Sequence, residues 1–163
     1  MKVKDVMMRT PVSCTAETNL GAAVETMWNR NCGILPVLNA QRQVIGVVTD
    51  RDVCIALGTR NRLAGEITVA EVTSGKAFVC KPDDDIRAAL VTMAHAKVRR
   101  LPVVNADGKL EGILSMDDVV AHSEARIPGK ASELSHDEVV DTLKTLYRGE
   151  VPEVVHKKTA VGA

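Results

Sequence analysis

The stretch ILPVLNAQRQVIGVVTDRDV, residues 34–53, returns 66 residues later as RLPVVNADGKLEGILSMDDV, residues 100–119. The correspondence extends without a gap over residues 12–53 and 78–119. Each copy is too short to bury its own apolar faces well, and internal repeats meet this difficulty by packing against each other. We therefore predict two copies of one supersecondary unit, related by a pseudo-two-fold axis, with the cleft between them as the natural place for a ligand.

Apolar periodicity and turn residues predict the same order of elements in each copy: strand, helix, strand, strand, helix. In the first copy we expect an extended segment, a helix that Thr18 caps, two strands and a helix that stops at Gly58, over residues 11–15, 19–30, 34–38, 44–49 and 51–57. The matching elements of the second copy are expected over residues 79–81, 82–96, 98–104, 110–115 and 116–122. The fold class that follows is α/β, with two β-α-β-β-α repeats side by side.

The repeat also suggests how the chain divides. We expect a first domain, a linker, a second domain and a C-terminal extension, over residues 1–58, 59–66, 67–124 and 125–163. A short strand or helical turn is expected at residues 67–72. In the extension, Ser135 can cap a helix over residues 136–147, and the polar stretch from Arg148 is expected to be poorly ordered.

Charge and hydropathy disfavour several classes of function. The 163 residues carry 21 Lys and Arg against 21 Asp and Glu, so the net charge gives no indication of nucleic acid or of an anionic membrane as a partner. No run of 18 apolar residues is present, and residues 1–5 lack the apolar stretch of a signal peptide. We therefore expect a soluble cytoplasmic protein that binds neither membrane nor nucleic acid.

The residues of catalytic and metal sites do not gather in this sequence. The four cysteines stand at positions 14, 32, 54 and 80, without a CxxC pair or a Cys-His cluster of zinc-like spacing. We expect them to be reduced and mostly buried, and we expect no metal site. There is also no Ser-His-Asp set, no Cys-His set and no phosphate-binding P-loop, which disfavours an enzyme.

The two strand-to-helix junctions have the residue types of a nucleotide site. Each ends in a hydroxyl followed three residues later by a carboxylate, as Thr49 and Asp52 in the first copy and Ser115 and Asp118 in the second. A helix N-terminus favours anions, and a carboxylate can accept hydrogen bonds from both hydroxyls of a ribose. The same spacing is also a variant of the capping box, in which the two side chains bind each other's backbone amides. Both interpretations remain open at this point.

Taken in order and in duplicate, these motifs resemble a tandem pair of CBS (cystathionine-β-synthase) domains, also called a Bateman module. The resemblance covers residues 1–123 and is carried by the two junctions and by three short motifs: Asp5-Val6-Met7, residues 33–37 and residues 99–103. The combination of residues 49–52 with residues 98–102 is similar to small stand-alone bacterial CBS proteins, including those of the hypoxic-response type. The resemblance implies two clefts for adenosine-containing ligands such as AMP, ATP, NAD or S-adenosylmethionine, and a homodimer formed through the helices.

The resemblance also implies roles for individual residues. In the first cleft Asp52 would hold the ribose, Thr49 the ribose or a phosphate, and Arg99 and Arg100 the phosphates. The adenine would lie against Val47 and the segment before the second copy, with Thr73, Lys76 and Phe78 as candidates. In the second cleft Asp118 and Ser115 would play the matching parts, with the base surrounded by Ile113, Met7, Thr10 and Val12.

The two clefts differ in their cations. The positions that match Arg99 and Arg100 in the first copy are Gly33 and Ile34, so a phosphate near Asp118 would have to borrow Arg99, Arg100 or Arg51. We therefore expect the Asp52 cleft to bind a phosphorylated ligand more tightly. The alternative for the arginine pair is an exposed strand end that forms ion pairs with Asp117 or Glu111.

The function implied by the resemblance is that of a regulatory sensor that binds an adenosine-containing ligand, needs no cofactor and signals to a separate partner protein. The alternative is a ligand-free stress-response or structural interaction protein whose clefts are vestigial. The loss of cations from the first copy fits that alternative.

Overall fold

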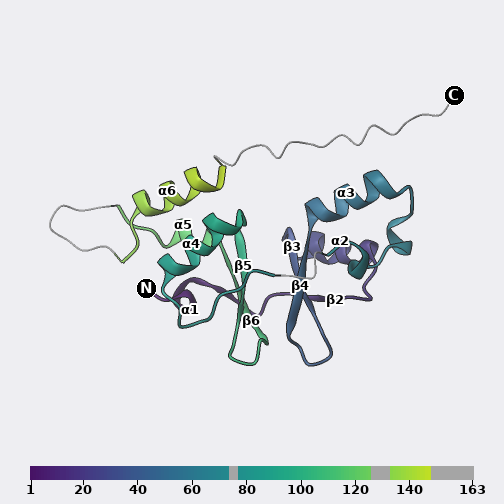
Figure 1. Cartoon of the computed structure of the whole chain (residues 1–163), viewed down its shortest axis with the longest axis horizontal. Coiled ribbons are helices and arrows are strands. Elements are labelled where there is room, and N and C mark those ends of the chain that lie inside the picture. The colour runs from purple at the N-terminus through teal and green to yellow at the C-terminus, as the bar shows by residue number, and fades with distance from the viewer. Residues whose placement is uncertain (74–76, 126–132, 148–163) are drawn as a thin grey trace.

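The computed structural model describes residues 1–73, 77–125 and 133–147. Two three-stranded sheets stand side by side, each with helices packed on it, as Figure 1 shows. This arrangement confirms the predicted α/β class and the pair of similar units. Within the described residues, no helix is long and apolar enough to cross a membrane.

The first repeat forms a sheet of order β2-β3-β4. Its elements are β2 (Cys14–Thr15), α2 (Leu20–Asn29), β3 (Ile34–Leu38), β4 (Val44–Thr49) and α3 (Asp50–Arg60). Strand β2 runs parallel to β3, and β3 pairs antiparallel with β4. The apolar residues on the inner faces of this repeat form one buried cluster, which includes Leu20, Leu35 and Val48.

The second repeat has the same hairpin and helices, but its sheet has the order β1-β6-β5. Its elements are β1 (Met8–Arg9), α4 (Ile86–Ala96), β5 (Arg100–Val104), β6 (Leu110–Ser115) and α5 (Met116–Ala121). The counterpart of β2 is a single parallel bridge from Cys80 to Val103. A second buried cluster, with Leu90, Leu101 and Leu114 among its members, fills this half.

The segments that precede the two copies are exchanged between them. Helix α1 (Val3–Val6) belongs to the core of the second repeat, whereas the 3-10 turn η2 (Val69–Glu71) belongs to the core of the first. The hydrogen bonds repeat with the sequence offset, because the Val3 amide donates to the Asp84 carbonyl at 3.0 Å and the Val69 amide to the Thr18 carbonyl at 2.8 Å. The core of each repeat therefore includes a segment that precedes the other repeat in the sequence.

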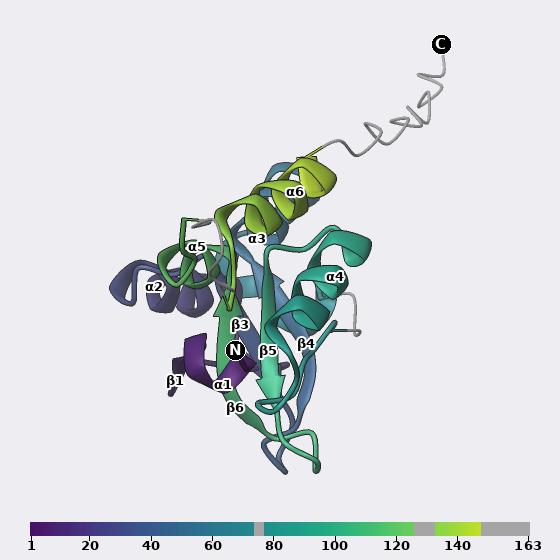
Figure 2. The same cartoon turned by 90° about the vertical axis from the view of Figure 1, so that its left-hand side faces the viewer.

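The hairpin tips mark the pseudo-two-fold axis. The Val44 amide donates to the Gly108 carbonyl at 3.0 Å, and its equivalent, the Leu110 amide, donates to the Arg42 carbonyl at 3.4 Å. Both tips need a residue in the left-handed region, which is Arg42 at φ 63° in one repeat and Gly108 at φ 77° in the other. Only the second repeat uses the residue that adopts this conformation without strain. Figure 2 shows the two hairpins at the same end of the molecule.

Helix α6 (His136–Tyr147) covers the helical side of the second repeat, where it packs on α4 and α5 (Figure 1). The expected cap is present, since the Ser135 hydroxyl accepts from the Glu138 amide at 3.3 Å and donates to the Glu138 carboxylate at 2.8 Å. Arg87 on α4 forms an ion pair with Glu138 at 2.5 Å and, together with the Ser135 amide, lowers the pKa of Glu138 to about 2. The tail expected to be disordered from Arg148 lies outside the described residues.

Two expectations about helix ends were wrong. Helix α2 is capped by Asn19, whose side chain accepts from the Ala22 amide at 2.9 Å, and not by Thr18. Helix α3 continues through Gly58 to Arg60 and ends at Asn61, which takes the left-handed conformation at φ 49°. A glycine inside a helix weakens it but does not end it, and asparagine tolerates the terminating conformation.

The cysteines are free thiols in the described structure, as expected. Burial raises the pKa of Cys14 to about 11 and that of Cys80 to about 12, with Asp84 adding to the effect at Cys80. Such thiols hold their protons at neutral pH and act as small apolar side chains. Cys54, in contrast, is exposed on α3.

Candidate functional site: two clefts between the repeats

A cleft of about 390 Å³ lies where the end of β4 faces the start of β5. Asp52, Thr49 and Val47 come from the first repeat, whereas Phe78 and the segment 97–100 come from the second. The sequence folds this way because β4 delivers the chain to the N-terminus of α3 beside the pseudo-axis. The cleft thus contains the hydroxyl and carboxylate groups and one cation of the first repeat, together with three cations of the second.

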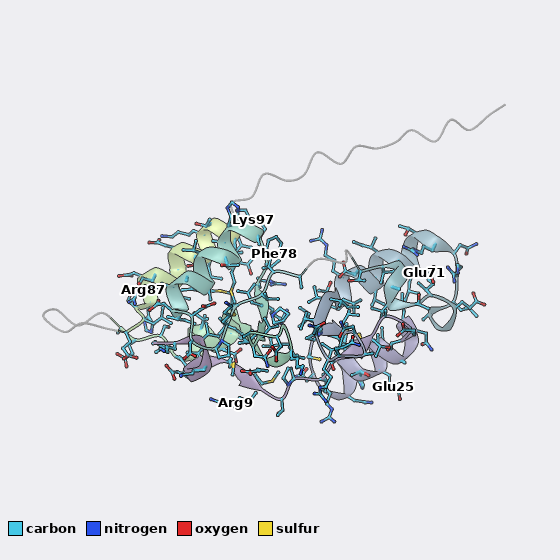
Figure 3. All side chains as sticks on the ribbon, turned by 60° about the horizontal axis from the view of Figure 1, so that its bottom comes forward. Arg9, Glu25, Glu71, Phe78, Arg87 and Lys97 are labelled. Carbon is cyan, nitrogen blue, oxygen red and sulfur yellow. The ribbon has the colours of Figure 1, made fainter. Side chains whose placement is uncertain are left out.

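The second cleft, of about 500 Å³, lies at the matching junction between β6 and α5. Ile113, Ser115 and Asp118 of the second repeat line it. Residues 8–12, at the start of the first repeat, and residues 30–32, after α2, line it as well. In Figure 3, Lys97 and Phe78 of the first cleft lie on one side of the molecule, whereas Arg9 of the second lies on the other.

The carboxylates at both junctions act as helix caps through one oxygen each. Asp52 Oδ2 accepts from the Thr49 amide at 2.9 Å and from the Thr49 hydroxyl at 2.7 Å. Asp118 Oδ2 accepts from the Ser115 amide at 2.9 Å and from the Ser115 hydroxyl at 2.6 Å. Within the described residues, no hydrogen bond reaches Oδ1 of either side chain. Capping and ligand binding are therefore compatible, because each carboxylate keeps an acceptor for a ribose hydroxyl.

The capping geometry limits what the Thr49 hydroxyl can do. Its proton is held by Asp52, and one of its lone pairs accepts from the Asp52 amide at 3.2 Å. The hydroxyl can accept one further hydrogen bond, but it has no proton to offer a phosphate. A phosphate in this cleft therefore depends on cationic side chains.

Four cations line the Asp52 cleft: Arg51, Lys97, Arg99 and Arg100. The sequence analysis assigned Arg99 and Arg100 to this cleft, but it considered Arg51 only for the Asp118 cleft. Lys97 was missed because it lies between the expected helix and strand, outside the motif of residues 99–103; in the structure it ends α4 with a φ of 57°. Its position two residues before Arg99 was the available signal.

The Asp118 cleft holds more positive charge than expected. Arg9 on β1 and Arg30 at the end of α2 line it, and Arg100 lies there too. The sequence analysis considered only Arg51, Arg99 and Arg100 for this cleft, because it did not foresee that β1 pairs with β6 and brings Arg9 beside Gly112. Of the three that it considered, only Arg100 lines the cleft.

Most of the remaining candidates lie where the resemblance suggested, with some shifts. Thr10 and Val12 line the Asp118 cleft. Met7, however, is buried in the core, and its neighbour Met8 lines the cleft instead. Thr73 lies beside the first cleft without lining it, and its hydroxyl donates to the Val47 carbonyl at 2.9 Å. Lys76 lies outside the described residues.

Arg100 is placed to serve both clefts. It lines each of them, as does Ile34, its counterpart at the offset of 66. The two matching positions therefore border both clefts, one with a charged side chain and one with an apolar side chain. The guanidinium of Arg100 lies 3.8 Å from Asp117, a long contact to an exposed carboxylate that leaves the arginine available to a ligand.

Two tandem matches to the CBS-domain family model cover residues 3–59 and 69–125, so the chain belongs to the CBS-domain family. Among curated relatives, it is 29% identical over 120 residues to the CBS domain-containing protein YhcV of Bacillus subtilis, a match of 74% of this chain and 84% of YhcV. It is 26% identical to the uncharacterised protein MK0525 of Methanopyrus kandleri, covering 72% of this chain and 57% of that protein. The chain spans about half the length of the first curated relatives that it matches.

Solved structures agree with this assignment. The CBS domain pair of protein MJ0100, solved in complex with 5′-methylthioadenosine and S-adenosyl-L-methionine, superposes with a TM-score of 0.68 at 19% identity. The match covers 74% of this chain and 94% of that one, and at this identity it shows the fold alone. The predicted family and fold are thereby confirmed.

Proposed function

We propose that the chain is a regulatory module, and not an enzyme, that binds an adenosine-containing ligand such as AMP, ATP or NAD between its two CBS repeats. One observation carries the proposal. In the Asp52 cleft a carboxylate oxygen with no partner among the described residues lies with four cations and the half-exposed ring of Phe78. These groups match a ribose, its phosphates and a base, in that order. The adenosine ligands in the related MJ0100 pair support the same class of ligand.

The test is calorimetric titration of the protein with AMP, ATP, NAD and S-adenosylmethionine, repeated with the variants Asp52→Asn and Asp118→Asn. Asparagine keeps an acceptor for the helix cap, so the fold should survive. It cannot, however, accept hydrogen bonds from two ribose hydroxyls. We expect at least one ligand to bind with micromolar affinity. Each variant should weaken the site in its own cleft about tenfold or more, which is the effect of losing a charged hydrogen bond.

The matched variants also separate this proposal from its alternative. Because the two aspartates have the same capping geometry, a general loss of stability would weaken both sites alike. Heat signals absent across the whole panel would instead favour the ligand-free interaction protein with vestigial clefts.

We further propose that the module is a homodimer formed through the first repeat. The corresponding face of the second repeat is covered by α6, whereas α2 and α3 expose Val24, Ile55 and Trp28, the last of them 85% exposed. A large indole with this exposure is a common anchor of protein interfaces. A second copy of this face would bury it.

Trp28→Glu is expected to convert the dimer to a monomer in sedimentation experiments, because burying an unpaired carboxylate at an interface is strongly unfavourable. Val140→Glu, on the outer side of α6, is the control and should leave the dimer intact. A wild-type protein that sediments as a monomer at micromolar concentration would contradict the proposal.

The module would act in the cytoplasm, which suits its four free cysteines. The described structure consists of the CBS pair and α6, and we propose that a separate protein chain senses the ligand-bound state. Each cleft is lined by residues of both repeats. A bound ligand would therefore contact both repeats at once and could change their relative position, which the partner would detect.

A further inference from the structure

The last turn of α6 is held by two cations of the Asp52 cleft. Lys97 donates to the carbonyl of Thr145, and Arg99 Nη1 donates to the hydroxyl of Tyr147 at 3.4 Å. Both cations line the cleft as well. A small pocket of about 180 Å³, lined by Arg99, Arg100 and Tyr147 among others, connects the cleft region with the end of the helix.

The two ends of α6 are attached in different ways. Its N-terminal end is fixed by buried apolar side chains, since Leu134 is fully buried and Val139 nearly so, and by the Arg87–Glu138 ion pair. At the C-terminal end Leu143 and Leu146 are only partly buried, and Tyr147 is 67% exposed. The contacts from Lys97 and Arg99 therefore add to a weaker apolar attachment at this end of the helix.

We propose that the last turn of α6, residues 144–147, is a latch that a phosphorylated ligand in the Asp52 cleft opens by drawing Lys97 and Arg99 away from it. This rests on the proposed function, because the latch needs an anion in that cleft. A phosphate is a stronger partner for a guanidinium or an ammonium group than a neutral hydroxyl or a carbonyl. Ligand binding and helix attachment thus compete for the same two side chains.

The competition gives the module a way to distinguish ligands by charge. An uncharged nucleoside such as adenosine can use Asp52 and Phe78 while Lys97 and Arg99 stay on α6. A nucleotide also attracts Lys97 and Arg99, and these two side chains can bind its phosphates only by leaving their partners on α6. Phosphorylated ligands would therefore change the surface that a partner protein meets, whereas the nucleoside would bind without this signal.

Tyr147 is the only tyrosine of the chain, so the protein labelled with 3-fluorotyrosine has a single ¹⁹F resonance that reports on the latch. We expect saturating ATP to move this resonance toward the position found in the ligand-free double variant Lys97→Gln/Arg99→Gln. Adenosine should leave it in place. Amide exchange of residues 144–147 should rise about tenfold with ATP, as expected for the loss of such contacts.

Two controls locate the effect. The Asp52→Asn variant should need about tenfold more ATP or more for the same shift. Lys144→Gln removes a lysine whose ion pair among the described residues is with Asp141 on α6 itself, and it should keep the shift at the wild-type ATP concentration. By reciprocity Tyr147→Phe, which frees Arg99, should tighten ATP binding about two- to fivefold and leave adenosine binding unchanged. ATP that binds in calorimetry without moving the resonance would overturn the latch alone. ATP that does not bind at all would overturn the proposed function and the latch with it.

Discussion

Gly112→Ala is expected to lower the free energy of unfolding by about 1–3 kcal/mol, as overpacking of a tight site does. A Cβ at this position would lie 2.8 Å from the Met8 carbonyl oxygen and 2.7 Å from the Met7 sulfur. The methionine side chain can move, but the carbonyl is fixed because Arg9 pairs with Gly112 in the β1–β6 ladder. Denaturant unfolding followed by circular dichroism measures the change.

Gly58→Ala is the matched control for the same substitution. This glycine lies inside α3, and nothing lies within 4 Å of the position that its Cβ would take. Alanine should therefore stabilise the chain by about 0.5–1 kcal/mol, since glycine weakens a helix interior. A Gly112→Ala protein as stable as the wild type would contradict the close approach of β1 to β6, and with it the exchange of N-terminal segments.

The exchange shows where the sequence was informative and where it was not. The repeat alone predicted two equal units, and it correctly located β3, β4 and β6, because continuous apolar runs bounded by turn residues specify short buried strands. It could not assign residues 3–9 to the second repeat. A segment of seven residues carries the same apolar pattern whichever core it enters, so the choice depends on packing between distant parts of the chain.

The residues of the candidate site were predictable to a similar degree. The junctions with Asp52 and Asp118 were recognised because the same motif occurs in both repeats. Each of these two aspartates lines a cleft. Arg9 and Arg30 were missed because they reach the Asp118 cleft only through the exchange and through the end of α2. The contrast drawn between a cationic and a cation-poor cleft followed from comparing matched positions. It did not account for side chains that lie outside the repeat motifs.

A different limit applies to the helix ends. Thr18 and Asn19 are adjacent and both suit a cap, so the sequence pattern favours neither strongly. Asn19 is selected by the backbone, because the Leu20 amide donates to the Ile67 carbonyl and the chain pairs there with Thr68. Ile67 and Thr68 belong to the segment that precedes the second repeat. The exchange of segments therefore also determines which residue caps α2.

Arg100→Gln is expected to weaken binding of ATP in both clefts, about tenfold or more in each, while adenosine binding changes little. The reason is that Arg100 lines both clefts and its one ionic contact among the described residues is the 3.8 Å approach to Asp117. Loss of a hydrogen bond between charged groups costs about 1.5–3 kcal/mol, which corresponds to at least a tenfold change in affinity. Calorimetry in the Asp52→Asn and Asp118→Asn backgrounds measures each cleft separately.

Single-cleft arginines provide the comparison. Arg51 lines only the Asp52 cleft and Arg9 only the Asp118 cleft, so Arg51→Gln and Arg9→Gln should each weaken one site and spare the other. An Arg100→Gln effect confined to one background would show that the guanidinium serves one cleft alone. The exposed contact to Asp117 contributes little to stability, so the fold should be unaffected.

A shared guanidinium also couples the two sites. One side chain cannot bind a phosphate fully on each side of the pseudo-axis at once, so the first nucleotide should weaken the second, and by reciprocity the order of filling should not matter. In the wild type this gives two unequal affinities for ATP beyond the intrinsic difference between the clefts. In Arg100→Gln the coupling should disappear, with both sites weaker but independent. Ile34 stands at the matching position in the first repeat and cannot replace the missing charge, so the coupling depends on this one arginine.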